Sequence, residues 1–566
     1  MDTPSVSAGL RYPVALMLSW LVTLSSLAWL GGCDARRPPE QPDATKTQSA
    51  SSGGVTAQAA PGAVSTGETG SVPSSPAAAS LPIADQAGGR AWLAAADLPY
   101  EFWEVQYLNA TRVGVTHYKV EKLDANRLRL SSETTMQIQR AGQMVRQKIK
   151  VESFEQQDGS VESYFEEIAG DSASATASVR GSVSDGVLRL AVARGGATTT
   201  KNVDWPSHAW GPLGLHQLLQ RQPMTAGERR NAKIFLPQLH QIAEVSLIAR
   251  NPEETPSPQG ILSGVLPIDV SMQLEQDTIQ SRIWVNARGQ IQKTIMTAGL
   301  NISSYLVPRA MAEQMEAQGQ IDLLAATSIK IEPPLIHADQ AARIDYMVES
   351  STKDPYSLLS HEGNQSTKSL SALRAQLTVV RSSLSLPPPE GSVQTPPGPE
   401  CLAANAWMQV DAPVIIKLAE QLSAGQSEPS AVARQLTEGV YRAIRKKNFS
   451  RAFDSATEVA HSLEGDCTEH AILLATLLRQ RRIPARLASG VVVNDATQAT
   501  AFVYHMWTEA WLGQHWVALD ATQGTPAGAG HIKFLETPLA DGNPYAALLP
   551  VLSTLGSLKI TLEAVK

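Results

Sequence analysis

Apolar and polar residues alternate along much of the chain between residues 93 and 310. The stretches RVGVTHYKVEKL, RLRLSSETTMQIQ and MVRQKIKVESFEQ follow this pattern, and turn residues such as Asp158-Gly159 separate such stretches. Alternation of this kind is typical of β-strands that bury one face. We therefore predict a β-rich domain over residues 93–310, a sandwich or a strongly curved sheet, that serves as a scaffold. Ligand binding or docking is the alternative, although the region shows no His, Asp or Glu cluster with metal-site spacing.

The pattern becomes helical after a proline-rich segment, SLPPPEGSVQTPPGPE, which closes a connecting region at residues 311–400. Beyond it, the apolar residues of AVARQLTEGVYRAIRKKNF recur at the spacing of one helix face. A second helical stretch precedes GDCTEHAILLATLLRQRRIPAR, and AFVYHMWTEAWLGQHWVALDATQG then alternates as a hairpin does. These features predict a C-terminal domain of helices and strands at residues 401–566. They predict an α+β fold class for the whole chain.

A continuous apolar run, YPVALMLSWLVTLSSLAWLGGC, lies near the start of the chain and ends at Cys33. It is long enough to span a membrane, and its ending, LGGC, resembles the lipobox of bacterial lipoproteins. This resemblance implies a lipoprotein signal or anchor over residues 1–33, with Cys33 lipidated; an uncleaved anchor or a plain signal peptide is the alternative. Residues 34–92, rich in Ala, Ser, Gly, Thr and Pro, predict a disordered linker. We therefore expect a protein of the cell envelope, lipid-anchored to a membrane and facing the periplasm or the exterior.

Composition and charge narrow the classes of partner. A chain of 566 residues is too long for one ordinary hydrophobic core and predicts several domains. The net charge of −7 and the pI near 5.9 argue against nucleic-acid binding, which usually requires a basic surface. We expect a protein or peptide substrate, a membrane contact through the lipid anchor, and no nucleic acid.

One of the three cysteines, Cys467, stands where a helix is predicted to begin. Gly465 ends the preceding helix, Asp466 is a suitable N-cap, and Glu469 completes a capping-box pattern. A thiol in the first turn lies at the positive end of the helix dipole, near N–H groups that favour a thiolate and can stabilise an oxyanion. The neighbouring Asp466 opposes the thiolate, and a buried core thiol is the alternative interpretation. A nucleophile also needs a base and a group that orients the base.

Residues 503–522 supply candidates for both partners. The two-residue loop of this predicted hairpin begins with Gly513, which is the type II′ pattern. With that loop, His505 becomes a diagonal neighbour of Asp520 on the same sheet face, at a backbone distance of about 7–8 Å that allows a side-chain contact. A slip of one residue would place the two side chains on opposite faces.

The two segments GDCTEHAILLATLLRQRRIPAR and YHMWTEAWLGQHWVALDAT together resemble the transglutaminase-like superfamily of papain-type thiol enzymes. The resemblance covers only the C-terminal part of the chain, where it implies a papain-like domain. It implies that Cys467 is the nucleophile, that His505 is the general base and acid, and that Asp520 orients the imidazole. It implies no cofactor.

The chemistry implied is acyl transfer through a cysteine thioester. We expect a membrane-tethered protease or amidase that acts on amide bonds of proteins or peptides, because bacterial relatives are more often regarded as hydrolases. A protein-cross-linking transglutaminase is one alternative, and a non-catalytic binding or assembly lipoprotein is another. The oxyanion-hole side chain is left open.

Other residues of the segment have competing roles. His470, one helical turn from Cys467, is the alternative base, although we expect a packing role for it. A metal site is also conceivable from three residues: Cys467, His470 and His505. The sequence shows no fourth ligand for it, so no metal site is predicted. Cys401 is expected to form no disulfide with Cys467, because such a bond would abolish the nucleophile. Three tryptophans are predicted to pack across the hairpin, with one at the substrate cleft as an alternative: Trp507, Trp511 and Trp516.

Overall fold

The structure is a computed structural model, and two of the predicted segments fall outside what it describes. The described residues are 98–140, 143–170, 176–274, 278–298, 300–314, 327–335, 337–385, 388, 392–446, 453–493, 501–540, 543 and 556–566. The predicted lipoprotein signal at residues 1–33, with Cys33, and the predicted linker at residues 34–92 lie outside them. Within the described ranges, no helix has the length and apolar character needed to cross a membrane.

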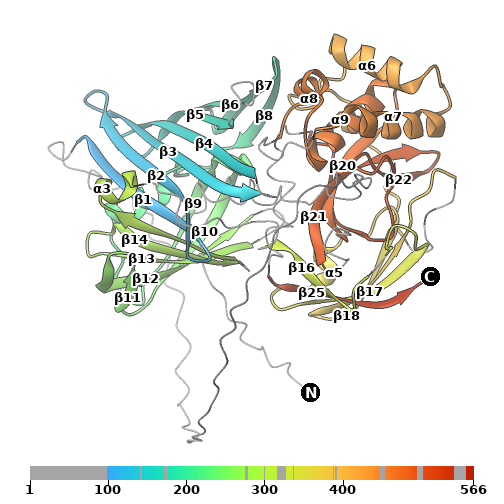
Figure 1. Cartoon of the computed structure of the whole chain (residues 1–566). Coiled ribbons are helices and arrows are strands. Elements are labelled where there is room, and N and C mark those ends of the chain that lie inside the picture. Colours follow the sequence, from blue (N-terminus) through green and yellow to red (C-terminus); the bar gives the residue numbers. More distant parts are fainter. Residues whose placement is uncertain are drawn as a thin grey trace, which may run out of the picture. The chain divides into compact units, whose positions relative to one another are not determined.

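The alternating N-terminal segments form one antiparallel sheet of 15 strands, drawn in blue to yellow-green in Figure 1. Its order is β8-β7-β6-β5-β4-β3-β2-β1-β15-β14-β13-β12-β10-β9, with β11 paired to β12. Alternate residues of strands such as β2 and β7 are buried, so the alternation in the sequence corresponds to the inner face of the sheet. The strands are β1 (Tyr100–Leu108), β2 (Thr111–Lys122), β3 (Arg127–Arg140), β4 (Gln143–Gln156), β5 (Val161–Gly170), β6 (Ala177–Ser184), β7 (Val187–Arg194), β8 (Ala197–Asp204), β9 (Arg229–Leu236), β10 (Gln241–Ala249), β11 (Glu253–Ser257), β12 (Gly260–Gln273), β13 (Thr278–Val285), β14 (Ile291–Ala298) and β15 (Leu300–Val307).

A second, ten-stranded sheet carries the C-terminal part of the chain. Its order is β18-β19-β17-β25-β16-β21-β20-β24, and β22 pairs with β21 and β23. Strands that precede and follow the predicted thiol-enzyme segment therefore join one sheet with it. The strands are β16 (Ile329–Glu332), β17 (Arg343–Ser350), β18 (Gln365–Ser371), β19 (Arg374–Val380), β20 (Ala485–Val493), β21 (Ala501–Leu512), β22 (His515–Asp520), β23 (Thr525–Pro526), β24 (His531–Thr537) and β25 (Leu558–Val565).

Four helices accompany the second sheet, and the last of them carries Cys467. They are α6 (Pro413–Ser423), α7 (Pro429–Ala443), α8 (Ala456–Ser462) and α9 (Cys467–Gln480). Helix α9 packs against β20 and β21 and against the other three helices. Its side chains are buried from Cys467 to Arg479, as expected for a helix that is apolar on nearly every side. The remaining helical segments in the described residues are α2 (Gly214–Arg221), η3 (Pro237–Leu239), α3 (Arg309–Glu313), α5 (Pro355–Leu358) and η4 (Pro399–Cys401).

The predicted α+β class is wrong, because the structure is mostly β, with 52% strand and 17% helix. The predicted order, a β-rich region before the thiol-enzyme region, fits the structure. The structure contains two large sheets, of 15 and ten strands, whereas its longer helices are α6, α7 and α9. Strands β16–β19 come from residues that were assigned to a connecting region. Of these, β16 pairs with β21 and β25, and β17 pairs with β25, through contacts distant in sequence.

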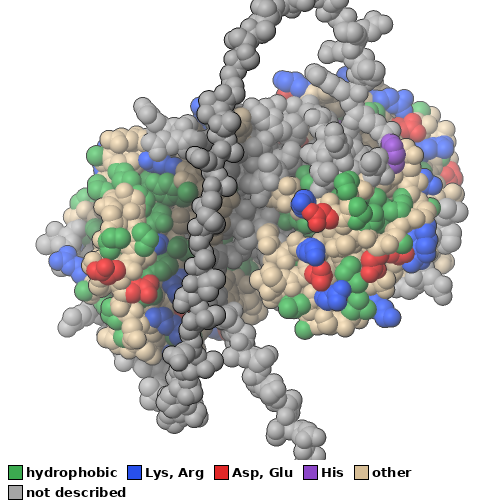
Figure 2. Space-filling model, turned by 60° about the horizontal axis from the view of Figure 1, so that its bottom comes forward, with side chains coloured by type: hydrophobic (Ala, Val, Ile, Leu, Met, Phe, Trp, Pro, Cys, Tyr) green, Lys and Arg blue, Asp and Glu red, His purple; other side chains and the backbone are tan. Residues whose placement is uncertain are grey.

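Charged side chains of both signs are interspersed on the face of the molecule shown in Figure 2. No single-sign patch stands out among the described residues of that face. This distribution agrees with the modest net charge of −7.

Candidate active site

The start of helix α9 holds Cys467 in a tightly bonded turn. The Asp466 side chain accepts a hydrogen bond from the Thr468 N–H at 2.9 Å, and the Glu469 side chain accepts one from the Asp466 N–H, also at 2.9 Å. The predicted capping box is confirmed. Gly465 has a φ of +155°, and a Cβ there would lie 2.2 Å from the Cβ of Glu469. Only glycine fits the turn that leads into Cys467.

Glu469 is a buried carboxyl group next to the thiol in sequence. Its Oε1 accepts a hydrogen bond from the Asp454 N–H at 3.1 Å, which ties the segment before α8 to the first turn of α9. Burial, together with the carboxyl groups of Asp466 and Asp454, raises the pKa of Glu469 well above its ordinary value. These surroundings favour the neutral form of Glu469, in which it adds no negative charge beside Cys467.

The hairpin that follows has the predicted register. Residues pair from Leu512 with His515 through Thr508 with Leu519, and Gly513 has the positive φ of +68° that its turn position requires. This prediction is confirmed. The register brings His505 to Asp520, with His505 Nε2 lying 2.9 Å from Asp520 Oδ2.

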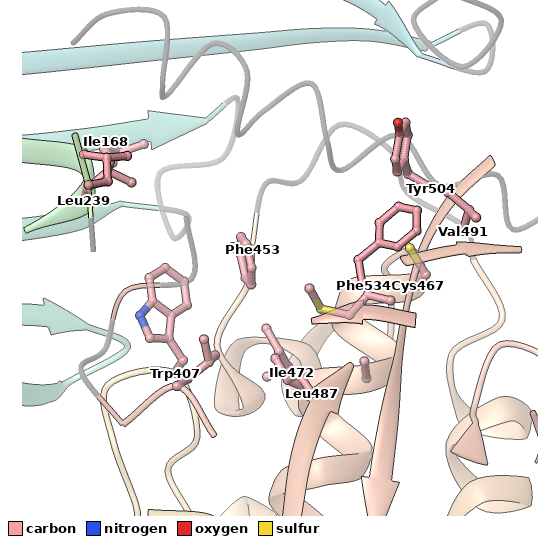
Figure 3. Packing of buried hydrophobic residues seen from close by; sticks show 14 of the residues in the cluster. Ile168, Leu239, Trp407, Phe453, Cys467, Ile472, Leu487, Val491, Tyr504 and Phe534 are labelled. Carbon is pink, nitrogen blue, oxygen red and sulfur yellow. The ribbon is translucent and has the colours of Figure 1, made fainter. Parts of the chain in front are cut away.

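Cys467, His505 and Asp520 lie in a hydrogen-bonded series. His505 is hydrogen-bonded to Cys467 as well as to Asp520. Because Asp520 occupies Nε2, Nδ1 is the ring nitrogen available to the thiol. The three residues are almost fully shielded from solvent, with exposed fractions of 2%, 5% and 0%. Figure 3 shows Cys467 in the buried cluster that also includes Phe534, Val491 and Tyr504.

The charges in this series stabilise one another. Burial alone would lower the pKa of His505, but the Asp520 carboxylate and the Cys467 thiol oppose it and raise the pKa to about 10. Burial would likewise raise the pKa of Asp520, yet the charge of His505 and the hydrogen bonds from His505 and His531 hold it well below its ordinary value. The site therefore favours an ionised Asp520 and a protonated His505. A thiol, an imidazole and a carboxylate in this order form the arrangement required for nucleophilic catalysis.

A fourth residue at the site, His531, was missed by the sequence analysis. Its Nε2 lies 3.0 Å from the same Oδ2 atom of Asp520. The other oxygen, Oδ1, accepts hydrogen bonds from the N–H and hydroxyl of Thr522 at 2.8 and 2.6 Å. His531 begins β24, which pairs with β20, and β20 in turn pairs with β21. Nothing in the local sequence specifies these strand pairings. The one signal in the sequence for the role of His531 is that a histidine follows Asp520 along the chain.

Three of these residues could hold a metal ion. Ligand atoms of His505, Asp520 and His531 lie within 4.8 Å of one another, and all three residues are buried. Among the described residues, this is the group with suitable geometry, and Cys467 and His470 do not belong to it. Nδ1 of His470 lies 2.5 Å from the backbone oxygen of Asp466, inside its own helix. That contact fits the packing role we expected for His470.

The hairpin tryptophans pack as predicted for cross-strand residues. Trp511 and Trp516 face each other across the two strands, with ring centroids 5.3 Å apart. Trp507 is buried and lies edge-on to His531, with ring centroids 5.3 Å apart. It is also near His505, at 6.1 Å between centroids. Trp507 thus covers the histidines that contact Asp520.

Cys401 provides a second thiol for comparison with Cys467. Neither residue forms a disulfide, and both are buried, with exposed fractions of 4% and 2%. Burial raises the pKa of Cys401. The two thiols thus have similar access to solvent, but only Cys467 is hydrogen-bonded to a histidine that contacts a carboxylate.

Comparison with solved structures gives matches of low similarity. A β-barrel-like protein from Brucella abortus, from a domain family of unknown function, is 10% identical with a TM-score of 0.30, covering 37% of this chain and 95% of its own. A protein from Cytophaga hutchinsonii described as a "putative cysteine protease" is 15% identical with a TM-score of 0.24, covering 40% of this chain and 86% of its own. We draw no conclusion about activity from either.

Comparison with protein families gives a match in the region of the candidate site. No curated protein matches the chain. The model of the transglutaminase-like superfamily matches residues 416–521, which include Cys467, His505 and Asp520. This match confirms the resemblance seen in the sequence. The chain carries a transglutaminase-like superfamily domain at residues 416–521.

Proposed function

We propose that this protein is a thiol hydrolase that cleaves amide bonds of proteins or peptides through a thioester on Cys467. The observation that carries the proposal is the hydrogen-bonded series from Cys467 through His505 to Asp520, at the capped N-terminus of α9. A thiolate beside an imidazolium, oriented by a buried carboxylate, is the arrangement of an activated cysteine nucleophile. Low local dielectric strengthens the interactions among these charges.

In the first step, the Cys467 thiolate attacks the carbonyl carbon of the amide. The carbonyl oxygen gains the negative charge, and the positive end of the dipole of helix α9 can stabilise it. His505 then gives its proton to the amide nitrogen as the C–N bond breaks. The amine leaves, and the acyl group remains on Cys467 as a thioester.

In the second step, a water molecule attacks the thioester. Neutral His505 takes one proton from the water, the C–S bond breaks, and a carboxylic acid and the Cys467–His505 pair are regenerated. A primary amine in place of water would give a new amide bond instead, which is the cross-linking alternative. We favour water because of the resemblance to bacterial thiol hydrolases.

We also propose that the enzyme acts in the cell envelope on a lipid tether. The LGGC ending of the apolar run, which places Cys33 at the lipidation position, supports this proposal. We expect the wild-type protein to be found in the membrane fraction and a Cys33→Ala variant to be lost from it. A variant that distributes like the wild type would contradict the tether.

Selective alkylation tests the nucleophile. We expect iodoacetamide to modify Cys467 much faster than Cys401, because both thiols are buried and only Cys467 is hydrogen-bonded to a histidine that contacts a carboxylate. Cys467→Ala should remove the fast reaction, and Cys401→Ala should leave it. Equal rates at the two cysteines would contradict a catalytic role and favour a binding or assembly protein.

Profiling on envelope peptides tests the reaction. We expect the wild type to release new amino and carboxyl termini, and Cys467→Ala to release none. Adding a primary amine distinguishes the second step, because transfer would incorporate the amine into the product. Amine incorporation that outruns hydrolysis would contradict the hydrolase proposal.

A further inference from the structure

Asp520 contacts two buried histidines, although the proposed mechanism uses only one of them. His505 Nε2 and His531 Nε2 lie 2.9 and 3.0 Å from the same atom, Asp520 Oδ2. These are ordinary N–H···O distances, so both rings donate to one oxygen. The side chain of His531 is 3% exposed, which excludes water as a ready alternative partner for its Nε2.

The other ring nitrogen of His531 determines its protonation pattern. Nδ1 is buried and has no hydrogen-bond partner among the residues that the structure describes. An N–H at that position would be a buried donor without an acceptor, which is costly, whereas a bare lone pair is tolerated better. His531 therefore carries its proton on Nε2 and directs it at Asp520.

We propose that His531 is a positioning residue that shares Asp520 Oδ2 with His505 and thereby limits how strongly the carboxylate holds the His505 imidazolium. This inference rests on the proposed function of Cys467. The physical reason is that an N–H donor withdraws negative charge from the oxygen that it contacts. The carboxylate is then a weaker partner for the second ring. A weaker hold lets the His505 imidazolium release its proton to the leaving amine more readily, as the first step requires.

The groups that determine how strongly Asp520 holds the His505 imidazolium come from three elements. His505 lies on β21, His531 lies on β24, and Cys467 at the start of α9 acts through His505. The remaining oxygen of Asp520 is held by Thr522, so the carboxylate cannot rotate to separate the two histidines without losing bonds. Removing His531 should therefore change the strength of the Asp520–His505 contact more than its geometry.

The test is the pH profile of Cys467 alkylation by iodoacetamide. The rate rises on an acid limb as the thiolate forms beside the imidazolium, and it changes again on an alkaline limb as the His505 imidazolium loses its proton. His531→Phe keeps the ring volume against Trp507 but removes the donor, so His505 should become more basic and keep its proton to higher pH. We expect the alkaline limb to move up by about one pH unit, the size of one lost charge-assisted hydrogen bond.

Two further variants separate the donor from the packing. In His531→Gln, an amide N–H replaces the donor, and the alkaline limb should return close to that of the wild type. His515→Leu, which changes a histidine of the same hairpin that does not contact Asp520, is the control and should leave the alkaline limb in place. His531→Leu provides a second donor-free variant if His531→Phe does not fold, as judged by thermal unfolding.

The outcomes distinguish this proposal from the proposed function. A reactive Cys467 whose alkaline limb stays in place, or moves to lower pH, in both donor-free variants overturns the role of His531 alone. A wild-type Cys467 that reacts no faster than Cys401 overturns the proposed function. An alkaline limb that shifts equally in His531→Gln and His531→Phe shows that ring packing matters rather than the donor, and also overturns the role of His531.

Discussion

Replacing Asp520 by asparagine tests how the site activates its thiol. The Oδ1 position accepts two hydrogen bonds from Thr522, so the asparagine oxygen should remain there. The amide NH2 group would then replace Oδ2 and face His505. A ring nitrogen that faces a donor must accept, which moves the His505 proton from Nε2 to Nδ1. With Nδ1 already protonated, His505 cannot take the proton of Cys467.

The loss of charge has a second effect that can be estimated. The pKa of His505 is raised from 6.5 to about 10, with burial opposing the Asp520 carboxylate and the Cys467 thiol. Without the carboxylate, burial should return the pKa to 6.5 or below. At a pH of about 8, the protonated fraction of His505 would then fall from about 0.99 to about 0.03, roughly thirtyfold. We expect Cys467 to be alkylated at least about thirtyfold more slowly, because the thiolate pairs with that imidazolium.

The assay is the alkylation rate of each cysteine, measured from its peptide by mass spectrometry. Cys401 is the internal control, because it is buried to a similar degree and has no contact with Asp520. Its rate should be the same in wild type and Asp520→Asn, which also shows that the fold is retained. A folded variant whose Cys467 reacts at the wild-type rate would refute the reasoning.

Two further predictions concern the fold that supports the site. Gly490→Ala places a Cβ 1.9 Å from the backbone oxygen of Ile532, so it should lower the free energy of unfolding in urea by about 3 kcal/mol or more. In Gly513→Ala, the new Cβ meets no atom within 4 Å, so the loss should be only about 1 kcal/mol. Equal losses in the two variants would contradict the close approach of β20 and β24. Burial raises the pKa of Glu104 from 4.5 to about 8, so the folded state binds the proton more tightly and the free energy of unfolding should fall as pH rises from about 4.5 to about 8. Between about pH 4.5 and about pH 7, the free energy of unfolding of the wild type should fall by about 3 kcal/mol more than that of Glu104→Gln, as measured by urea unfolding. The same dependence on pH in both proteins would contradict this prediction.

Local sequence determined the elements that carry the site. The cap at Asp466, the helix that begins at Cys467 and the loop at Gly513 each depend on residues a few positions apart. Because a two-residue loop sets the register of its hairpin, the contact between His505 and Asp520 followed from the sequence as well. Hydrogen bonds within a turn and the alternation of faces are short-range effects, which is why the sequence alone was enough.

Tertiary structure decided the rest. The approach of Cys467 to His505 requires α9 to pack on β21, and before the structure only the family resemblance implied it. His531 reaches Asp520 because β24, β20 and β21 lie side by side. Strands β16–β19 and β25 join the same sheet, which adds to the strand content of the C-terminal part of the chain. Each strand alone has unpaired N–H and C=O groups that many other strands could satisfy. The choice among those partners depends on how the whole chain packs, which no local pattern records.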